Sequence, residues 1–212
     1  ILLMHENLKA GMTEEELWSI LHKTNIENGG EWFETRLLNS GPKTNPWFQE
    51  CSNRIIQEGE IVAFDTDMVG PYGYCADISR TFVEGGKLTN YQKKIHSLAY
   101  ENVKYNEELI KPGLSFKEFA EKAWQLPDNC FDNHYPCQVH GVGMSDEWPF
   151  IAYPNKDYSN GDYDAVFEEN MVICVESYIG EKDEKEGAKL EDQYLVTNNG
   201  LELLSSIPLN LV

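Results

Sequence analysis

Three aspartates in the first half of the chain, Asp65, Asp67 and Asp77, lie in or beside apolar, strand-like sequence. The run Ile61-Val62-Ala63-Phe64 predicts a buried strand, and Asp65 and Asp67 project to one face of the extended chain that follows it. A turn predicted at Gly70-Pro71-Tyr72-Gly73 brings Asp77 back to them. Carboxylates gathered in this way repel each other and resist burial unless a cation joins them. The hairpin therefore predicts a cation site, with the alternative that some aspartates, Asp67 above all, cap the turn and face water.

Three further candidate ligands, His140, Glu176 and Glu191, lie in the second half of the chain. Glu176 belongs to the apolar run 171–178, and Glu191 to a strand predicted over 188–197. The alternative for Glu176 is an ion pair, but residues 172–175 supply no base, and a lone buried carboxylate is costly. The alternative for His140 is a satisfied histidine beside a glycine-rich turn. Taken with the three aspartates, the set indicates a metal centre.

The composition of this ligand set restricts the metal. Five carboxylates and one imidazole are too many for a single zinc ion, which is typically four-coordinate. They suit two divalent ions bridged by carboxylates. Oxygen-rich ligation favours iron, and manganese, cobalt and zinc are the alternatives.

The charge and composition of the chain exclude several classes of partner. The 212 residues carry a net charge of −19, which argues against nucleic acid and against anionic membranes. No apolar run approaches the roughly 20 residues of a membrane span. The five cysteines form no CxxC pair, so reduced thiols and a cytoplasmic location are expected.

A weak internal repeat, called the internal echo below, indicates a duplicated architecture. Thr13 with Glu16, and Ser115 with Glu118, form capping boxes within similar local sequences. These boxes predict helices at equivalent places in two halves of the chain. In each half a predicted hairpin with an acid on both arms follows. Two such units pack about a pseudo-twofold axis, and sites form where the halves meet.

The remaining predicted elements fill the space between these motifs. A helix is expected to end near residue 10, a strand is expected over 34–39, a capped helix runs from 90 to about 110, another helix ends near 125, and a short strand covers 137–139. The aromatic loop 153–163 is a candidate lid.

The order of the acidic residues and the sequence stretches around them resemble a known family. The stretches "GMTEEEL", "GEIVAFD", "DISRTF", "HGVGM" and "LEDQYLVT" are similar to the pita-bread metallopeptidase superfamily, which includes methionine aminopeptidase, aminopeptidase P and prolidase. The resemblance implies an α/β (α+β) pita-bread fold: a curved antiparallel sheet, helices packed outside it, and a dinuclear metal site on the pseudo-twofold axis. It also implies a homodimer.

Two departures from the peptidase pattern point to one branch of that superfamily. Asp65 and Asp67 precede Asp77 by twelve and ten residues, and neither spacing is usual in the peptidases. After His140-Gly141-Val142-Gly143, acids stand where the peptidases carry another histidine. Both features resemble the DddP-type dimethylsulfoniopropionate lyases, as does "HGVGMSDEWP".

The resemblance to the lyase branch implies roles for individual residues. It makes Asp146 the catalytic base, places Tyr135 and His140 in contact with the substrate, and completes the metal ligand set. That set is Asp65, Asp67, Asp77, His140, Glu176 and Glu191. The branch carries an additional N-terminal domain, so residues 1–212 are expected to be a single catalytic domain and a fragment of a longer protein.

The leading hypothesis is a metal-dependent lyase that splits dimethylsulfoniopropionate into dimethyl sulfide and acrylate by β-elimination. Its small substrate has a carboxylate for the metal pair and a sulfonium for an aromatic face, with Tyr135, Trp148 and Tyr153 as candidates. The alternative is a dinuclear aminopeptidase or Xaa-Pro peptidase of the same superfamily. A binding module without catalysis ranks last, because all six ligands are present.

Overall fold

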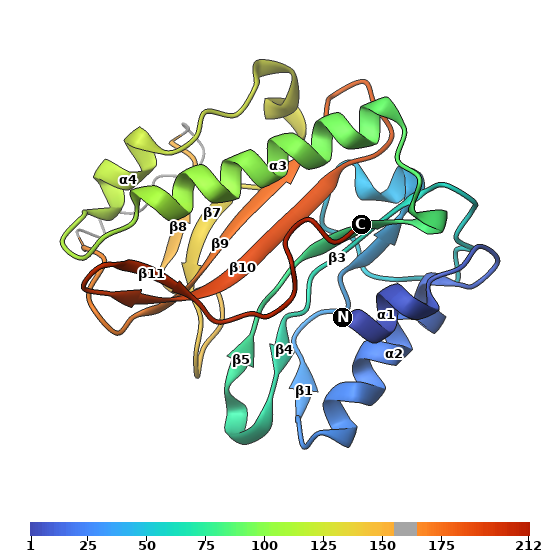
Figure 1. Ribbon diagram of the computed structural model, residues 1–212, viewed down its shortest axis with the longest axis horizontal. Helices are drawn as coiled ribbons and strands as arrows, with labels where there is room; N and C mark the ends of the chain where they lie inside the picture. Colours follow the sequence, from blue (N-terminus) through green and yellow to red (C-terminus); the bar gives the residue numbers. More distant parts are fainter. Residues whose placement is uncertain (155–164) are drawn as a thin grey trace.

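The computed structural model describes residues 1–154 and 165–212, and it shows a mixed α/β architecture (Figure 1). The strands of the described part pair antiparallel in three sheets, whose orders are β1-β4-β5, β2-β3-β6 and β11-β10-β9-β7-β8. The helices are α1 (Leu2–Asn7), α2 (Glu14–Glu27), α3 (Asn90–Leu109) and α4 (Phe116–Lys122). The strands are β1 (Trp32–Phe33), β2 (Leu38–Ser40), β3 (Ile61–Phe64), β4 (Met68–Val69), β5 (Cys75–Ala76), β6 (Arg80–Val83), β7 (Cys137–Gly141), β8 (Phe150–Ala152), β9 (Val172–Ile179), β10 (Ala188–Thr197) and β11 (Gly200–Leu203).

The first half of the chain folds around β3. All four residues of this strand are buried, because β2 and β6 flank it, α1 and α2 cover Val62 and Phe64, and Ile61 and Ala63 on the other face belong to the core that contains α3 and β9. Helix α2 begins as predicted, with the Thr13 side chain accepting from the Glu16 amide while the Glu16 side chain accepts from the Thr13 amide. Such reciprocal capping satisfies two amides that the first helical turn leaves unpaired.

The predicted hairpin is present as β4 and β5. Met68 pairs with Ala76 and Val69 with Cys75, and the turn between them places Tyr72 at φ 66°. The hairpin lies at the lower edge of the molecule in Figure 1, next to β1, with which β4 pairs. The strand pairing returns the chain to Asp77, as the sequence predicts.

The second half is a five-stranded sheet with the long helix α3 lying across it (Figure 1). Ile95, Ala99 and Val103 form the buried stripe of α3, at the spacing of a helix face. At the centre of the sheet, β9 and β10 pair over eight residues in the register that sets Glu176 directly opposite Glu191. Two acids in a directly opposed pair repel each other unless cations lie between them.

Strand β10 joins the two halves. Lys189 and Thr81 exchange hydrogen bonds of 2.9 and 2.8 Å, and the Glu191 amide donates to the Ser79 carbonyl at 3.1 Å. The carboxylate-bearing strand of the second half therefore lies against the segment that follows Asp77 in the first half.

The sequence located most elements, with specific errors at their ends. The N-terminal helix ends at Asn7 rather than near 10, and α4 ends at Lys122 because Ala123 turns to an extended ψ of 160°. The strand predicted over 34–39 starts only at Leu38, since the Glu34 amide donates to the Asp67 carbonyl and so extends the pairing of β1 with β4, whereas pairing with β3 begins at Leu38. Strands β1, β8 and β11 were not predicted, and residues 155–163 of the candidate lid lie outside the described residues.

Within the described residues, none of the helices combines the length and the apolar character that crossing a membrane requires.

Candidate metal centre

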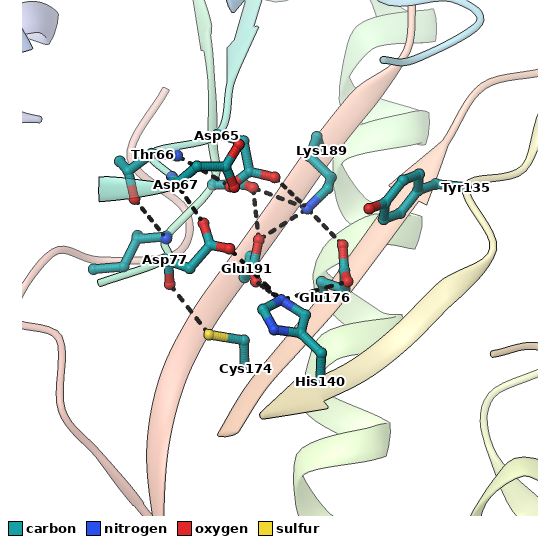
Figure 2. A network of polar contacts seen from close by, with 12 residues as sticks. Asp65, Thr66, Asp67, Asp77, Tyr135, His140, Cys174, Glu176, Lys189 and Glu191 are labelled. Atoms are coloured by element: carbon teal, nitrogen blue, oxygen red, sulfur yellow. Dashed lines mark hydrogen bonds and ion pairs between the residues drawn. The ribbon is translucent and has the colours of Figure 1, made fainter. Parts of the chain in front are cut away.

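The six predicted ligands meet where β3, β7, β9 and β10 converge (Figure 2). All six are at most 5% exposed. Their donor atoms form groups that lie within 4.8 Å of one another, such as Asp65 with Asp67 and Asp77, and Asp65 with Glu176 and Glu191. The two halves of the chain thus contribute to one cluster, as the internal echo predicts.

The three aspartates are held by the backbone around Thr66. The Thr66 hydroxyl donates to the Ala76 carbonyl and accepts from the Ile78 amide, both at 2.9 Å, which ties the two arms of the hairpin together. Asp67 has a φ of 35°, and its amide donates to Asp77 Oδ1 at 3.3 Å. The Thr35 hydroxyl donates to the Asp67 carboxylate. The alternative of a solvent-facing Asp67 is therefore wrong, because the residue is only 5% exposed.

His140 on β7 closes the cluster from the second half. Its Nε2 lies 2.9 Å from Glu191 Oε1, 3.6 Å from Asp77 Oδ2 and 3.7 Å from Glu176 Oε1. One imidazole nitrogen therefore faces carboxylates from both halves, in a position from which it can ligate one metal ion.

Lys189 on β10 is a member of the cluster that the sequence analysis missed. Its fully buried ammonium lies 3.0 Å from Asp65 Oδ2, 2.7 Å from Glu176 Oε2 and 2.9 Å from Glu191 Oε2, and it donates to the Ser79 hydroxyl at 3.0 Å (Figure 2). Glu176 does form an ion pair, contrary to the prediction, because its base lies on the neighbouring strand β10 and not among residues 172–175. A signal was available, because residues two apart on a strand share a face, so Lys189 accompanies Glu191.

The pKa values of the clustered acids are shifted in opposite directions. Burial, followed by repulsion from Asp65, raises the pKa of Asp67 to about 9 and that of Asp77 well above its usual range. Burial also raises the pKa of Glu176, to about 7, against the attraction of Lys189. The pKa of Glu191 falls below its usual range because Lys189 and His140 outweigh its burial.

The pKa of His140 is moved by the same groups. Burial opposes its charge, but the hydrogen bond to Glu191 and the surrounding carboxylates raise the pKa of His140 to about 10. The cluster therefore favours positive charge at its centre.

The donor set fits a divalent cation. Glu176 Oε1 and Asp146 Oδ2 are buried without a hydrogen-bond partner, which is costly for carboxylate oxygens unless a cation completes them. Oxygen donors with one imidazole are the ligands that hard and borderline divalent metals accept. Cys174 also lies within reach, but burial raises the pKa of its thiol well above the usual range, and the thiol contacts the Asp77 carbonyl at 3.4 Å.

Asp146 lies beside His140, in the loop that follows β7. Its side chain is 2% exposed, and its Oδ1 lies 3.7 Å from His140 Nδ1 and accepts from the Glu147 amide at 3.0 Å. Burial raises the pKa of Asp146 to about 6, against the attraction of His140. The group is thus a carboxylate at neutral pH and a stronger base than an exposed aspartate.

Tyr135 borders the cluster on the side of Lys189 and Glu176 (Figure 2). The Lys189 ammonium lies 5.4 Å from the centre of the Tyr135 ring, and the Tyr135 hydroxyl donates to Glu147 at 3.3 Å. The other two aromatic candidates are placed differently. Tyr153 is buried and its hydroxyl accepts from Asn102, whereas Trp148 is 62% exposed.

Arg80 is fully buried and contacts the backbone of Ser79 and Glu191, next to the cluster. Its guanidinium pairs with Asp192 at 2.6 Å and donates to the carbonyls of Ser79 and Glu191, at 2.8 and 2.5 Å. It also donates to Ile207 and Pro208, at 2.5 and 3.1 Å. One side chain therefore joins the ligand-bearing strand β10 to the segment after β11.

Residues 2–198 match the model of metallopeptidase family M24. The chain belongs to this family. Among curated M24 relatives, it is 46% identical over 198 residues to the dimethylsulfoniopropionate lyase DddP of Roseovarius nubinhibens, and 44% identical over 197 residues to that of Roseobacter denitrificans. The alignments cover 92% of this chain, which spans only 44% of the length of either relative.

A solved M24 structure has the same fold. The prolidase of Pyrococcus horikoshii superposes with a TM-score of 0.82 at 27% identity, covering 99% of this chain and 58% of the prolidase. The resemblance to the pita-bread superfamily and the predicted fold class are confirmed. Membership of M24 accords with a cluster built for divalent metal ions.

Proposed function

We propose that this M24 chain is the catalytic domain of a metal-dependent lyase that cleaves dimethylsulfoniopropionate to dimethyl sulfide and acrylate. The observation that carries the proposal is Asp146, a buried carboxylate that lies beside the ligand cluster with one oxygen unpartnered. The 46% and 44% identity to two DddP lyases supports it.

The metal ligands in this proposal are Asp65, Asp67, Asp77, His140, Glu176 and Glu191, holding two divalent ions, with iron favoured. These residues would hold the ions, which would supply Lewis-acid chemistry toward the substrate carboxylate and so acidify the adjacent C–H group. Lys189 and two divalent ions together balance the charge of five ligating carboxylates. This balance keeps the ligands ionised in a buried site.

Asp146 removes the proton from the carbon next to the substrate carboxylate. The electron pair of that C–H bond forms the new double bond, the bond between carbon and sulfur breaks, and its electron pair leaves with dimethyl sulfide. Acrylate remains, and the proton passes from Asp146 to solvent. The pKa of about 6 suits the task, since the base is ionised at neutral pH while remaining basic.

The direct test is release of dimethyl sulfide from the metal-loaded protein, measured in the headspace. Absence of gas together with cleavage of a proline-containing dipeptide would refute the lyase proposal.

The replacement Asp146→Asn should lower the rate of gas release at least about 100-fold, because it removes the general base. Elemental analysis should find the metal content unchanged. Asp128→Asn, an exposed aspartate remote from the cluster, is the matched control and should leave the rate unchanged. Loss of metal from Asp146→Asn would instead assign Asp146 to the ligand set.

A peptidase is the second candidate, favoured by the M24 match and by the 27% identity to a prolidase. The distinguishing residue is again Asp146. Hydrolysis of Xaa-Pro dipeptides by the metal-loaded protein, undiminished in Asp146→Asn, would support the peptidase over the lyase.

The proposal extends to organisation and location. We propose that residues 1–212 form one catalytic domain that works as a homodimer in the cytoplasm. All five cysteines are free and buried, which agrees with a reducing compartment. Light scattering of the purified protein tests the dimer.

A further inference from the structure

Lys189 divides the oxygens of the two paired glutamates into two sets. Its ammonium lies 2.7 Å from Glu176 Oε2 and 2.9 Å from Glu191 Oε2 (Figure 2). The other oxygen of each glutamate faces His140, whose Nε2 lies 2.9 Å from Glu191 Oε1 and 3.7 Å from Glu176 Oε1. Each carboxylate therefore points one oxygen at the ammonium and the other at the part of the cluster around His140.

The oxygens on the lysine side already have their partners. Glu191 Oε2 accepts from the Ser79 hydroxyl at 2.9 Å and from Lys189, and the Ser79 hydroxyl itself accepts from the ammonium at 3.0 Å. On the other side, Glu176 Oε1 is buried without a hydrogen-bond partner among the described residues. Because an unpaired buried carboxylate oxygen is costly, the oxygens prepared for a metal ion are those on the His140 side.

The ammonium of Lys189 is a fixed point in this arrangement. It has no exposed surface, and its third carboxylate contact, to Asp65 Oδ2, is 3.0 Å long. The contacts with three carboxylates and the Ser79 hydroxyl use all of its donors. A glutamate that turned both oxygens towards a metal ion would break a contact with a fully buried charge, which is strongly unfavourable.

The number of carboxylate oxygens on offer discriminates among divalent ions. Ca²⁺ takes about six to eight oxygen ligands and often both oxygens of one carboxylate. First-row transition ions such as Co²⁺ are smaller and accept imidazole nitrogen together with single carboxylate oxygens. Keeping two oxygens bound to an ammonium therefore removes ligands that Ca²⁺ needs and the smaller ion does not.

We propose that Lys189 is a positioning residue that selects small first-row ions against Ca²⁺, because it keeps one oxygen of Glu176 and one of Glu191 bound to its ammonium. This inference rests on the proposed ligand set, but on neither the lyase nor the peptidase activity. The positive charge of Lys189 repels any divalent ion, so charge alone weakens the binding of Co²⁺ and Ca²⁺ alike. Only the occupied oxygens distinguish the two ions.

Displacement of bound Co²⁺ by Ca²⁺, followed by the visible absorption of the bound cobalt, measures the ratio of the two dissociation constants directly. Lys189→Met keeps a long side chain and releases both glutamate oxygens. The ratio of the dissociation constant for Ca²⁺ to that for Co²⁺ should therefore fall about tenfold, a change typical of losing a partner that orients metal ligands. Lys43→Met, which removes the ion pair with the buried Glu14, is the matched control and should leave the ratio unchanged.

A second variant leaves the ammonium in place. Ser79→Ala removes only the hydroxyl that donates to Glu191 Oε2, so the ratio should fall by about two- to threefold. If Lys189→Met does not fold even with Co²⁺, this variant decides: a lowered ratio supports the inference, and an unchanged ratio overturns it.

The outcomes separate the role of Lys189 from the metal centre and from the reaction. An unchanged ratio in a folded Lys189→Met overturns the inference, because the lysine then acts through its charge alone. Wild-type protein that binds neither ion refutes the ligand set on which the inference rests. A lowered ratio in Lys189→Met, in a protein whose wild type releases no dimethyl sulfide, supports the role of Lys189 and counts against the lyase.

Discussion

The two halves of the chain supply acids to one cluster, but they neutralise them differently. In the second half, Glu191 lies against Lys189 and His140, and its pKa is lowered. In the first half, Asp67 and Asp77 have raised pKa values and no cation of their own half. The sheet of β9 and β10 thus carries its own counter-charges and shares one with Asp65 through Lys189, whereas Asp67 and Asp77 depend on an external cation.

This difference has a structural origin. The second-half acids lie on two long paired strands, where a strand neighbour such as Lys189 automatically shares their face. The first-half acids lie next to short strands and a turn, where the amides of Thr66 and Asp67 and the hydroxyl of Thr35 donate to them. Regular strands therefore supply side-chain counter-ions, and the hairpin supplies mainly dipoles.

Removing the buried ammonium of Lys189 should have the largest effect on the free energy of unfolding. Lys189→Met leaves three carboxylates without their shared ammonium, and the free energy of unfolding of the metal-free protein should fall by on the order of 5 kcal/mol. Urea denaturation measures it. The surface control Lys122→Met should change stability by less than about 1 kcal/mol, since its pair with Glu118 is exposed. A loss of that small size in Lys189→Met would contradict the idea that the second half is self-neutralised.

Amide replacements compare one acid from each half. In the metal-free protein at pH 7, Glu191→Gln should cost about 3 kcal/mol, because it breaks contacts with both Lys189 and His140. Asp67→Asn should change stability by about 1 kcal/mol or less, because a carboxyl with a pKa of about 9 is already uncharged at that pH. Both variants should bind added metal more weakly, which isothermal titration measures. Equal losses of stability would show that the halves are neutralised alike.

The pH dependence of the metal-free protein should be opposite to ordinary acid denaturation. A carboxyl whose pKa is raised in the folded state, such as Asp67 at about 9 or Glu176 at about 7, binds more protons when folded, so stability falls as the pH rises. His140, with a pKa of about 10, acts in the same direction, because the stability of its charged form is lost as pH rises through that value.

The melting temperature of the metal-free protein should therefore rise as the pH is lowered from about 9 to about 5. Saturating metal should flatten this dependence, because a bound cation keeps the carboxylates ionised. Calorimetry across that range measures it, and a metal-free melting temperature that falls on acidification to pH 5 would count against the raised values.

The smallest expected difference lies at the two equivalent helix starts. Thr13 and Glu16 cap each other reciprocally, whereas Ser115 only accepts from the Glu118 amide, and the Glu118 side chain pairs with Lys122 instead. Thr13→Ala should cost about 1 kcal/mol and Ser115→Ala less, as denaturation curves would show. The reverse order would mean that the half with the single-sided cap depends more on it.

The sequence could predict which acids gather in the cluster because the signals that mark them are local. Buried acids in apolar strands, a turn of defined length and capping boxes all leave marks within a few residues, and Asp65, Asp77 and Glu191 were found in this way. Lys189 required a judgement about which face of β10 lies inward. The stacking of Phe48 on Tyr135 could not be predicted, because it joins residues far apart in the sequence and needs a backbone conformation that no spacing reveals.

The secondary-structure elements that local sequence marks were predicted, whereas those that depend on distant strands were not. Helix α3 and strands β3 and β10 follow from periodicity and caps, and their bounds agree closely with the prediction. Strands β8 and β11 are short, and their pairing with β7 and β10 depends on the sheet already being assembled. The register of Glu176 against Glu191 is likewise a property of the completed sheet.

The contacts of Arg80 carry a practical lesson for protein engineering. Because its guanidinium binds carbonyls of both β10 and the Ile207–Pro208 segment, the polypeptide after β11 is part of the support of the cluster. A protease site or an affinity tag introduced directly after Leu203 would open a buried guanidinium to water and disturb a centre that is remote in sequence. Fusion designs should therefore preserve residues 204–209 as part of the folded domain.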